Sequence, residues 1–249
     1  MSIANNAAVT QTHCKAEMTA IATFHVIRWK SMLGMAQAVV WDRIRYRRTS
    51  GLVFLRVLGT GRGNSTAPSA AFDRTALFCL FSDEASADAF IRKIRSRRHS
   101  AESWHVKLRG AGGHGSWRGR EIPVLLGRES SASSAESHGP LAMITRADVR
   151  PRSWRAFSRD ARVVDKELHT TDGVLAVIAI GDAPILRQGT FSLWRDAAAI
   201  AQFARGGPEH SRVMQRTREE KWYGEEMFAR FVPYWSAGTW DGIDPLDIG

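Results

Sequence analysis

The chain has 249 residues, 44% of them hydrophobic, which is enough for one large core or two small ones and argues against disorder. The longest apolar run, residues 174–180, is too short to span a membrane, and the N-terminus lacks the basic and apolar regions of a secretory signal. Two cysteines are too few for a disulfide framework, so we expect a cytoplasmic protein.

Basic residues outnumber acidic ones and give the chain a net charge of +10. Such a charge favours polyanionic partners: nucleic acid, an anionic membrane surface, or ligands that carry carboxylate or phosphate groups. The basic residues cluster at 43–48 and at 92–98. Both clusters fall near the predicted C-termini of helices, where cations also offset the helix dipole, so they do not define a function by themselves.

Residues 1–19 are predicted to form a flexible tail, and residues 20–126 a first folded unit. Hydrophobic periodicity, caps and turn residues predict the elements of this unit. They are a strand at 20–29, a helix at 31–48, a strand at 52–58 opened by Gly51, a glycine-rich loop at 59–69, a strand at 75–81, a helix capped by Asp83, and a strand at 103–109.

A serine-rich linker at 127–139 leads to a second unit at 140–249. The predicted elements follow the same order, with one additional helix before the last strand. They are strands at 141–147, 174–180, 191–194 and 226–233, and helices at 151–168, after Asp196, and at 208–224.

Sequence landmarks recur in the same order in the two units. Gly51 and Gly173 each open a strand; SDEASADAF at 82–90 corresponds to RDAAAIAQF at 195–203, and GSWRG at 115–119 to GTWDG at 238–242. Self-similarity at a long spacing is typical of repeated architectures. We therefore predict two tandem copies of one β-α-β-β-α-β unit.

This element order predicts a four-stranded antiparallel sheet with both helices on one face, the ferredoxin-like arrangement. Packing the bare faces of two such sheets together gives an α+β fold of the dimeric α/β-barrel type. The interior of such a barrel can hold a ligand, and the alternative is that it is solid core.

The sequence lacks the signatures of P-loop NTPases, serine hydrolases, zinc proteases and covalently attached haem. His210 is the strongest chemical candidate, because it follows Pro208 in the first turn of a predicted helix and shares a face with Val213, Met214 and Thr217. An imidazole beside apolar side chains can ligate a haem iron. The alternative is a capping or buried histidine.

The segment RDAAAIAQFARGGPEHSRVMQRTREEKWYGEEMFARFVPYWSAGTWDG, residues 195–242, resembles the C-terminal half of the spheroidene monooxygenase family, the acyclic-carotenoid ketolases. The first half agrees more loosely, through GTGRG at 59–63 and AESWHVKL at 101–108. The resemblance covers most of residues 20–242.

The resemblance implies a haem-dependent oxidoreductase, with a b-type haem ligated by His210, that uses O₂ or peroxide to oxidise an apolar, carotenoid-like substrate. An arginine in the matching segment can pair with a haem propionate. The residues that the resemblance places at the haem are His210, Met214, Arg216, Arg218, Trp222 and Tyr223. An electron donor, a homodimer and association with a membrane surface are compatible with this expectation.

The sequence departs from the family after GTGRG, where NSTAPSAAF replaces a Gly-Phe and Pro/Asn-rich stretch. Two other functions stay open. One is a cofactor-free or other small-molecule enzyme on the same barrel, with His25, His105 or Tyr223 as the base. The other is a basic nucleic-acid-binding module that uses the two arginine clusters, although no RNP-type strand supports it.

Overall fold

The computed structural model describes residues 19–61, 70–127, 139–183, 187–205 and 208–248. In these residues, antiparallel strands close into one barrel in the order β1-β3-β2-β6-β7-β5-β8-β4. The strands are β1 (Ile21–Trp29), β2 (Leu52–Gly61), β3 (Ala70–Phe81), β4 (Ser100–Gly115), β5 (Leu141–Val149), β6 (Val174–Ala183), β7 (Arg187–Trp194) and β8 (Tyr223–Gly238). The predicted α+β barrel is confirmed.

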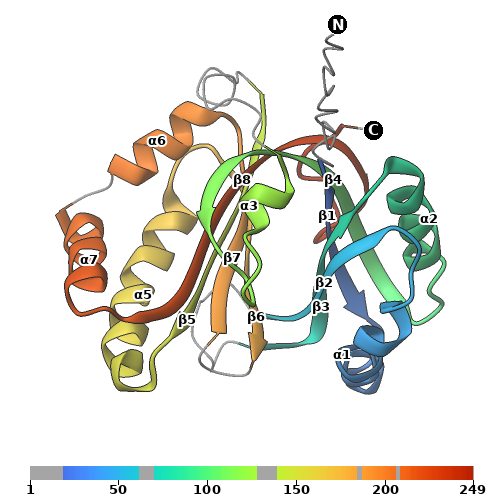
Figure 1. The fold of residues 1–249 in the computed structure, drawn as a ribbon, viewed down its shortest axis with the longest axis horizontal. Helices are drawn as coiled ribbons and strands as arrows, with labels where there is room; N and C mark the ends of the chain where they lie inside the picture. The colour runs from blue at the N-terminus through green and yellow to red at the C-terminus, as the bar shows by residue number, and fades with distance from the viewer. Residues whose placement is uncertain (1–18, 62–69, 128–138, 184–186, 206–207, 249) are drawn as a thin grey trace, which may run out of the picture.

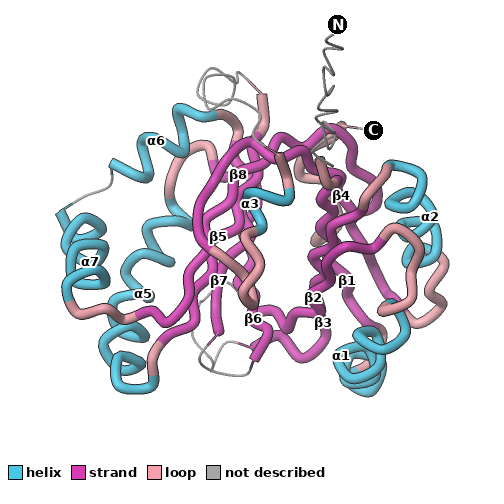
Figure 2. Tube along the Cα trace, in the orientation of Figure 1, coloured by secondary structure: helices cyan, strands magenta, loops and turns pink. Residues whose placement is uncertain are grey.

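The helices lie outside the barrel, as Figures 1 and 2 show. They are α1 (Met32–Tyr46), α2 (Glu84–Arg95), α3 (Ile122–Leu125), α5 (Trp154–Thr170), α6 (Ala197–Arg205) and α7 (Pro208–Glu219), with a 3₁₀ turn, η2 (Pro151–Ser153). Helices α1 and α2 cover the first half of the barrel, and α5, α6 and α7 the second. No helix in the described ranges has the length and apolar character that crossing a membrane requires.

The chain thus runs twice through strand, helix, strand, strand, helix, strand, with α7 added before β8. The two halves are joined at their sheet edges. Strand β4 pairs with β8 from Trp104 opposite Gly238 to Gly115 opposite Met227, whereas β2 and β6 pair only at Gly59–Gly181 and Thr60–Ile180. One seam is therefore long and the other short.

The landmark glycines have equivalent conformations. Gly51 has φ +67° and its carbonyl accepts from the N–H of Ser82, while Gly173 has φ +86° and its carbonyl accepts from the N–H of Arg195. Side chains occupy the space that a Cβ would need at either position, so both the conformation and the packing require glycine.

The other landmarks also match in structure. Asp83 caps α2 by accepting from the N–H of Ser86, and Asp196 accepts from the N–H of Ala199 in α6. Trp117 and Trp240 lie in the turns after β4 and β8, where each begins an isolated antiparallel bridge and enters the core. The interpretation of the halves as copies of one ferredoxin-like unit, with boundaries at 20–126 and 140–249, stays a prediction.

The interior of the barrel is solid core. Inward-facing side chains from all of the strands form one buried cluster, in which Phe24 and Phe191 stack with ring centroids 3.8 Å apart and Phe78 stacks on Trp117 at 5.5 Å. The two halves contribute these rings to the same space. The prediction of a ligand-holding interior between the halves is therefore wrong, and the alternative of a packed core holds.

Two smaller clusters lie between the barrel and its helices, one under α1 and α2 and one under α5 and α6. The helix predicted at 208–224 is shorter than expected, since α7 ends at Glu219 and β8 begins at Tyr223. Lys221 adopts a left-handed φ of +49°, and the N–H of Trp222 bonds to the carbonyl of Thr217. This reversal turns the chain from the helix into the strand.

Candidate functional site

Helix α7, which carries His210 in its first turn, lies on the outside of the barrel beside α5 (Figure 1). It does not face the barrel interior, so a site at His210 belongs to the outer surface of the second half. The side chains of His210, Met214 and Arg218 lie outside what the structure describes. Their predicted contacts with a haem stay predictions.

Two of the other predicted site residues tie α7 to its surroundings. Arg216 donates from Nη1 to Asp160 of α5 over 2.7 Å and from Nε to Glu220 over 3.1 Å. The guanidinium carbon also lies 5.2 Å from the ring centroid of Trp222, which is buried and donates to Glu220. The structure therefore brings Arg216 and Trp222 together as the anchor of the C-terminal end of α7.

Tyr223, the first residue of β8, follows Trp222 directly in the chain. Its ring meets that of Phe157 edge to face, with centroids 6.1 Å apart. Burial raises the pKa of the Tyr223 phenol, and a hydrogen bond with Thr217 lowers it by less. The phenol is thus held in its protonated form, which suits a donor better than a base.

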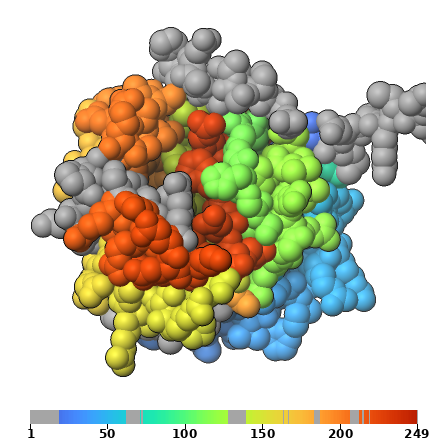
Figure 3. All heavy atoms as spheres, turned by 60° about the vertical axis from the view of Figure 1, so that its left-hand side comes forward, coloured from blue at the N-terminus to red at the C-terminus, as the bar shows by residue number. Residues whose placement is uncertain are grey.

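A strip of side chains on the outer faces of β4, β5 and β8 lies next to α7 along the sheet. Thr145 is exposed although β5 pairs on both sides, and Phe228 lies opposite it on β8. His114 of β4 stacks on Phe228 with centroids 5.7 Å apart. Figure 3 shows the surface hollowed between α6 and α7 in front of β8. The helices therefore leave part of this sheet face uncovered.

Arg230 adds to the strip a cation that forms no ion pair with the described residues. It lies two residues after Phe228 on β8, and its guanidinium extends over Gly112, where a Cβ would be 3.7 Å from Nη2. The Nε atom of Arg230 is buried and has no hydrogen-bond partner among the described residues. A buried donor without a partner is costly, so this guanidinium is arranged to receive an anionic or carbonyl-bearing group.

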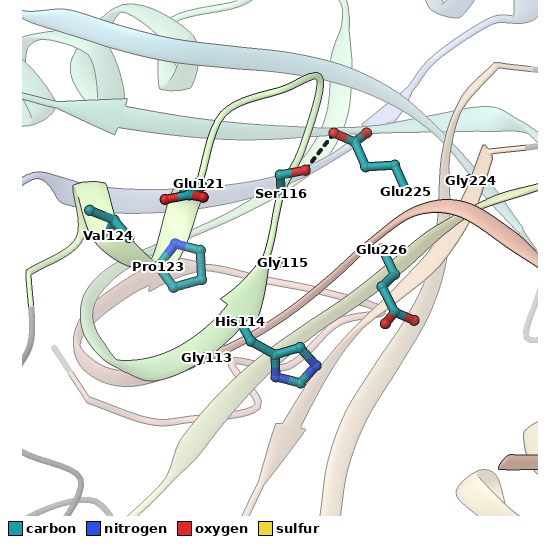
Figure 4. Close-up of a pocket in the computed structure, with 10 residues that line it drawn as sticks. All are labelled: Gly113, His114, Gly115, Ser116, Glu121, Pro123, Val124, Gly224, Glu225 and Glu226. Atoms are coloured by element: carbon teal, nitrogen blue, oxygen red, sulfur yellow. Dashed lines mark hydrogen bonds between the residues drawn. The ribbon is translucent and has the colours of Figure 1, made fainter. Parts of the chain in front are cut away.

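A pocket of about 420 Å³ adjoins the strip where β4 ends and β8 begins. His114 belongs to both, and Figure 4 shows its ring and the carboxylate of Glu226 on one side of the pocket, away from Glu225. The full lining is Gly113, His114, Gly115, Ser116, Glu121, Pro123, Val124, Gly224, Glu225 and Glu226.

Glu225 has a structural role in this pocket. Its carboxylate accepts from Ser116 Oγ, from the N–H groups of Arg118 and Gly119, and from Arg146. Burial alone would raise the pKa of Glu225, but these donors lower it to about 2. Glu225 is therefore a fixed anion that holds the turn after β4, and it is unsuited to act as a base at neutral pH.

His25 and His105, the bases of the cofactor-free alternative, form a buried pair on β1 and β4. Their Nδ1 atoms are 3.0 Å apart, and their Nε2 atoms bond to Thr23 and Ser103. Burial lowers the pKa of His105 to about 3, and the nearby Arg95 lowers it further. Burial also lowers the pKa of His25 well below its usual value, with a smaller contribution from His105. Both rings are neutral and enclosed, and that of His25 also packs near Phe90 of α2.

Sequence reasoning missed His114, Thr145, Phe228 and Arg230 as a group. A signal for Arg230 exists, because it interrupts the apolar strand EMFARFVP at a position on the same face as Phe228 and Val232. No local signal places Arg230 beside Gly112 or Phe228 beside His114, since both depend on the pairing of β4 with β8. In the described ranges no cluster of three or more His, Cys, Asp or Glu side chains could hold a metal ion.

Three proteins that are similar to this chain in sequence are all named spheroidene monooxygenase. The spheroidene monooxygenase of Rubrivivax gelatinosus is 38% identical over 198 residues, which cover 77% of this chain and 73% of that protein. The one from Rhodobacter capsulatus is 31% identical over 197 residues, covering 78% and 80% of the two chains. The one from Cereibacter sphaeroides is 30% identical, and the match spans 59% of its length. No protein-family profile matches the chain.

Among solved structures, two of aldoxime dehydratase share the fold. One has a TM-score of 0.58 at 9% identity and covers 88% of this chain and 82% of its own. The other, in complex with butyraldoxime, has a TM-score of 0.59 at 8% identity and covers 88% and 80%. These likenesses concern the arrangement of the barrel and its helices.

Proposed function

Because the chain belongs to the spheroidene monooxygenase family and is thereby an oxygenase, we propose that it is haem-dependent and oxidises an apolar, carotenoid-like substrate. In this proposal His210 ligates the iron of a b-type haem at the hollow between α7 and the outer face of β8. O₂ or peroxide is the oxidant, and O₂ requires a separate electron donor.

The observation that carries the proposal is the uncovered face of β8 next to the helix that bears His210. Phe228 lies on this face beside Thr145 and stacks on His114, and the buried Nε of Arg230 has no partner among the described residues. These features fit a planar apolar group with anionic edges, since the ring would meet the aromatic wall and a propionate could accept from the guanidinium. When bound, haem supplies the oxygen activation that protein side chains cannot.

The chain's own residues would then bind, orient and exclude water. His210 holds the iron through one ring nitrogen, and its second nitrogen needs an acceptor that fixes the tautomer. Phe228 and Val232 pack against the apolar cluster under α5 and α6, so they form a rigid wall that keeps water from the reacting C–H bond. Arg230 donates to an anionic group, and the Arg216–Asp160 pair fixes α7 against α5.

Met214, Arg218, Trp222 and Tyr223 complete the proposed haem surroundings. Trp222 and Tyr223 are buried or half-buried where α7 passes into β8, so they act on the site by holding this corner. The enclosed histidine pair does not favour the cofactor-free alternative, because neither ring opens on the described pocket. A homodimer is part of the proposal as well.

The test uses protein loaded with haemin, a reductant, isotopically labelled O₂ and spheroidene as the probe substrate. We expect a carotenoid product that carries the label, and we expect it to be lost in His210→Ala but retained in His99→Ala, an exposed histidine away from α7. Equal activity in haem-free protein would refute the haem and support the cofactor-free alternative.

A further inference from the structure

Helix α1 presents an apolar face to solvent. Leu33, Val40 and Ile44 are 68%, 59% and 65% exposed, and Met32 and Trp41 are exposed to a similar degree. Isolated apolar side chains on a surface need no explanation, but a group this large on one helix marks an interaction surface.

The exposure follows from the geometry of the helix. Ser31 caps α1 by accepting from the N–H of Gly34, and the buried positions are Ala38, Asp42 and Tyr46. These three recur every four residues and face β2 and β3. Positions 33, 40 and 44 are spaced by seven and four residues, so they form one stripe on the opposite side. The helix therefore has two apolar sides, of which the barrel covers one.

The exposed charged side chains of α1 and of the turn that follows it are all positive. Arg43, Arg45, Arg47 and Arg48 are exposed at its C-terminal end. The acidic residue of α1, Asp42, is buried and paired with Arg97, and no acidic residue lies in the first turn. The stripe thus runs into a cationic end without any exposed carboxylate on the helix.

We propose that this face of α1 docks on an anionic phospholipid bilayer. A helix lying in the membrane interface inserts its apolar stripe among the acyl chains while its arginines contact the phosphate headgroups. Trp41 is suited to the boundary between the two layers, because its ring is apolar and its N–H is polar. We name this surface, Met32, Leu33, Val40, Trp41 and Ile44 with Arg43, Arg45, Arg47 and Arg48, the α1 face.

A second copy of the chain fits this surface less well. A symmetric pair of α1 faces would bring the arginine-rich end of one helix either against its equivalent or against a first turn without carboxylates. Neither arrangement neutralises the arginines, and like charges oppose association. An anionic bilayer supplies both the apolar layer and the countercharge.

The inference goes beyond the proposed function by assigning a surface that docks on a membrane. Figure 1 shows α1 and α7 on opposite sides of the barrel, so docking through α1 leaves the surface at α7 and β8 free. The test below involves neither haem nor turnover, so the two proposals can fail separately.

The first measurement is sedimentation of the full chain with phosphatidylcholine vesicles, with and without phosphatidylglycerol. We expect binding to the mixed vesicles that falls at least about tenfold in Leu33→Glu/Val40→Glu/Ile44→Glu and in the variant with the four arginines changed to Gln. All of these side chains are exposed, so the variants are expected to keep the wild-type circular dichroism spectrum and thermal midpoint.

Matched control variants carry the same kinds of substitution at exposed positions outside α1. Val124→Glu/Leu175→Glu/Ile243→Glu removes three exposed apolar side chains outside α1, and a second variant changes the exposed Arg120, Arg152, Arg155 and Arg162 to Gln. Both are expected to bind the vesicles like the wild type. Equal loss in the controls would mean that binding depends on overall charge and polarity, which overturns the assignment to α1.

Trp41 provides an independent readout. Lipids brominated on their acyl chains should quench part of the tryptophan fluorescence of the bound protein, and Trp41→Phe should remove most of that quenching. If the wild type instead stays in the supernatant and dimerises in a concentration-dependent way that the triple Glu variant abolishes, the α1 face is an interface between copies and the proposal is wrong.

Discussion

Two arginines on neighbouring strands show how differently the barrel uses a guanidinium. Arg146 of β5 is buried and paired with Glu225 and Asp148, below the ring of Trp117. Arg230 of β8 has a buried Nε without a described partner. The first arginine forms ion pairs, although its Nη2 atom has no hydrogen-bond partner among the described residues, whereas the second has no described ion pair and its buried Nε is a cost to folding that a ligand can offset.

We therefore predict opposite effects for the same substitution. Arg230→Leu should change the free energy of unfolding of haem-free protein by less than about 1 kcal/mol, or raise it, because no described ion pair is broken. Arg146→Leu should cost about 3–5 kcal/mol, because it breaks the ion pairs of a buried guanidinium with Glu225 and Asp148. Urea titrations followed by tryptophan fluorescence measure both, and a large loss in Arg230→Leu would show that this guanidinium already has a partner.

The histidine pair predicts a pH dependence of stability. Because burial lowers the pKa of His25 and His105 in the folded state, protons bind preferentially to the unfolded chain as pH falls below about 6.5. The contribution of this pair to the free energy of unfolding should therefore not change with pH above pH 7. It should fall between pH 6.5 and 5 by up to about 1.4 kcal/mol per pH unit for each ring.

The measurement is the urea midpoint as a function of pH in wild type, His105→Gln and His99→Gln. The first variant should have a shallower slope in this window, and the second, which changes an exposed histidine, should keep the wild-type slope. A wild-type slope in His105→Gln would mean that another group titrates in this range.

At the scale of elements, α7 is held by few contacts. It packs on α5, and the pair between Arg216 and Asp160 is its described ionic link to that helix. Asp160 is 8% exposed, whereas Arg159, which pairs with the same carboxylate, is 70% exposed. The buried link should therefore carry the stabilisation, and the exposed one should contribute little.

Hydrogen exchange tests this difference. Asp160→Ala should speed amide exchange in α7 by about tenfold, which corresponds to about 1.4 kcal/mol of local opening free energy, and leave the barrel strands unchanged. Arg159→Ala should exchange like the wild type. If Asp160→Ala leaves α7 unaffected, the helix is held mainly by its apolar side.

The sequence predicts elements well where local chemistry determines them. Asp83 caps the helix that follows it, and Gly51 and Gly173 open strands, as predicted, whereas Ser31 is the N-cap of α1 and not its first residue. Helix α7 ends at Glu219, about five residues before the end that the sequence predicts. The reason is the left-handed φ of Lys221, a conformation that the residue type lysine does not predict. The length of β8 depends likewise on its partners β4 and β5.

At the scale of the whole molecule, the two halves share one core. Phe24 of the first half stacks on Phe191 of the second, and Trp104 contacts both Phe191 and Trp240. The stability of the predicted unit at 20–126 therefore depends on that of the unit at 140–249, because side chains from both form the same core. We expect them to unfold in one cooperative transition.

A glycine substitution makes this prediction measurable. Gly51→Ala places a Cβ 2.3 Å from Ser86 Oγ at a φ of +67°, so it should destabilise the first half by about 1–3 kcal/mol. Calorimetry should show a single peak at a lower midpoint, with equal calorimetric and van't Hoff enthalpies. Gly139→Ala, where nothing lies within 4 Å, is the control. Two separate peaks would contradict the shared core.

The location of the candidate site is the part that sequence could not provide. A barrel was expected to hold its ligand inside, but the aromatic side chains of both halves fill that space. Part of the outer face of β5 and β8 is uncovered because α5 and α6 contact mainly β6 and β7, although Met143, Phe228 and Val232 still pack in the cluster beneath these helices. The segment that resembles the family, residues 195–242, contains both α7 and β8, so the proposed site lies within it.

The most direct test of the central claim is the absorption spectrum of purified protein titrated with haemin. We expect a shifted Soret band that saturates at one haem per chain, is lost in His210→Gly, returns when imidazole is added to that variant, and persists in His99→Ala. A spectrum of His210→Gly identical to that of the wild type, or no Soret shift in the wild type, would contradict it.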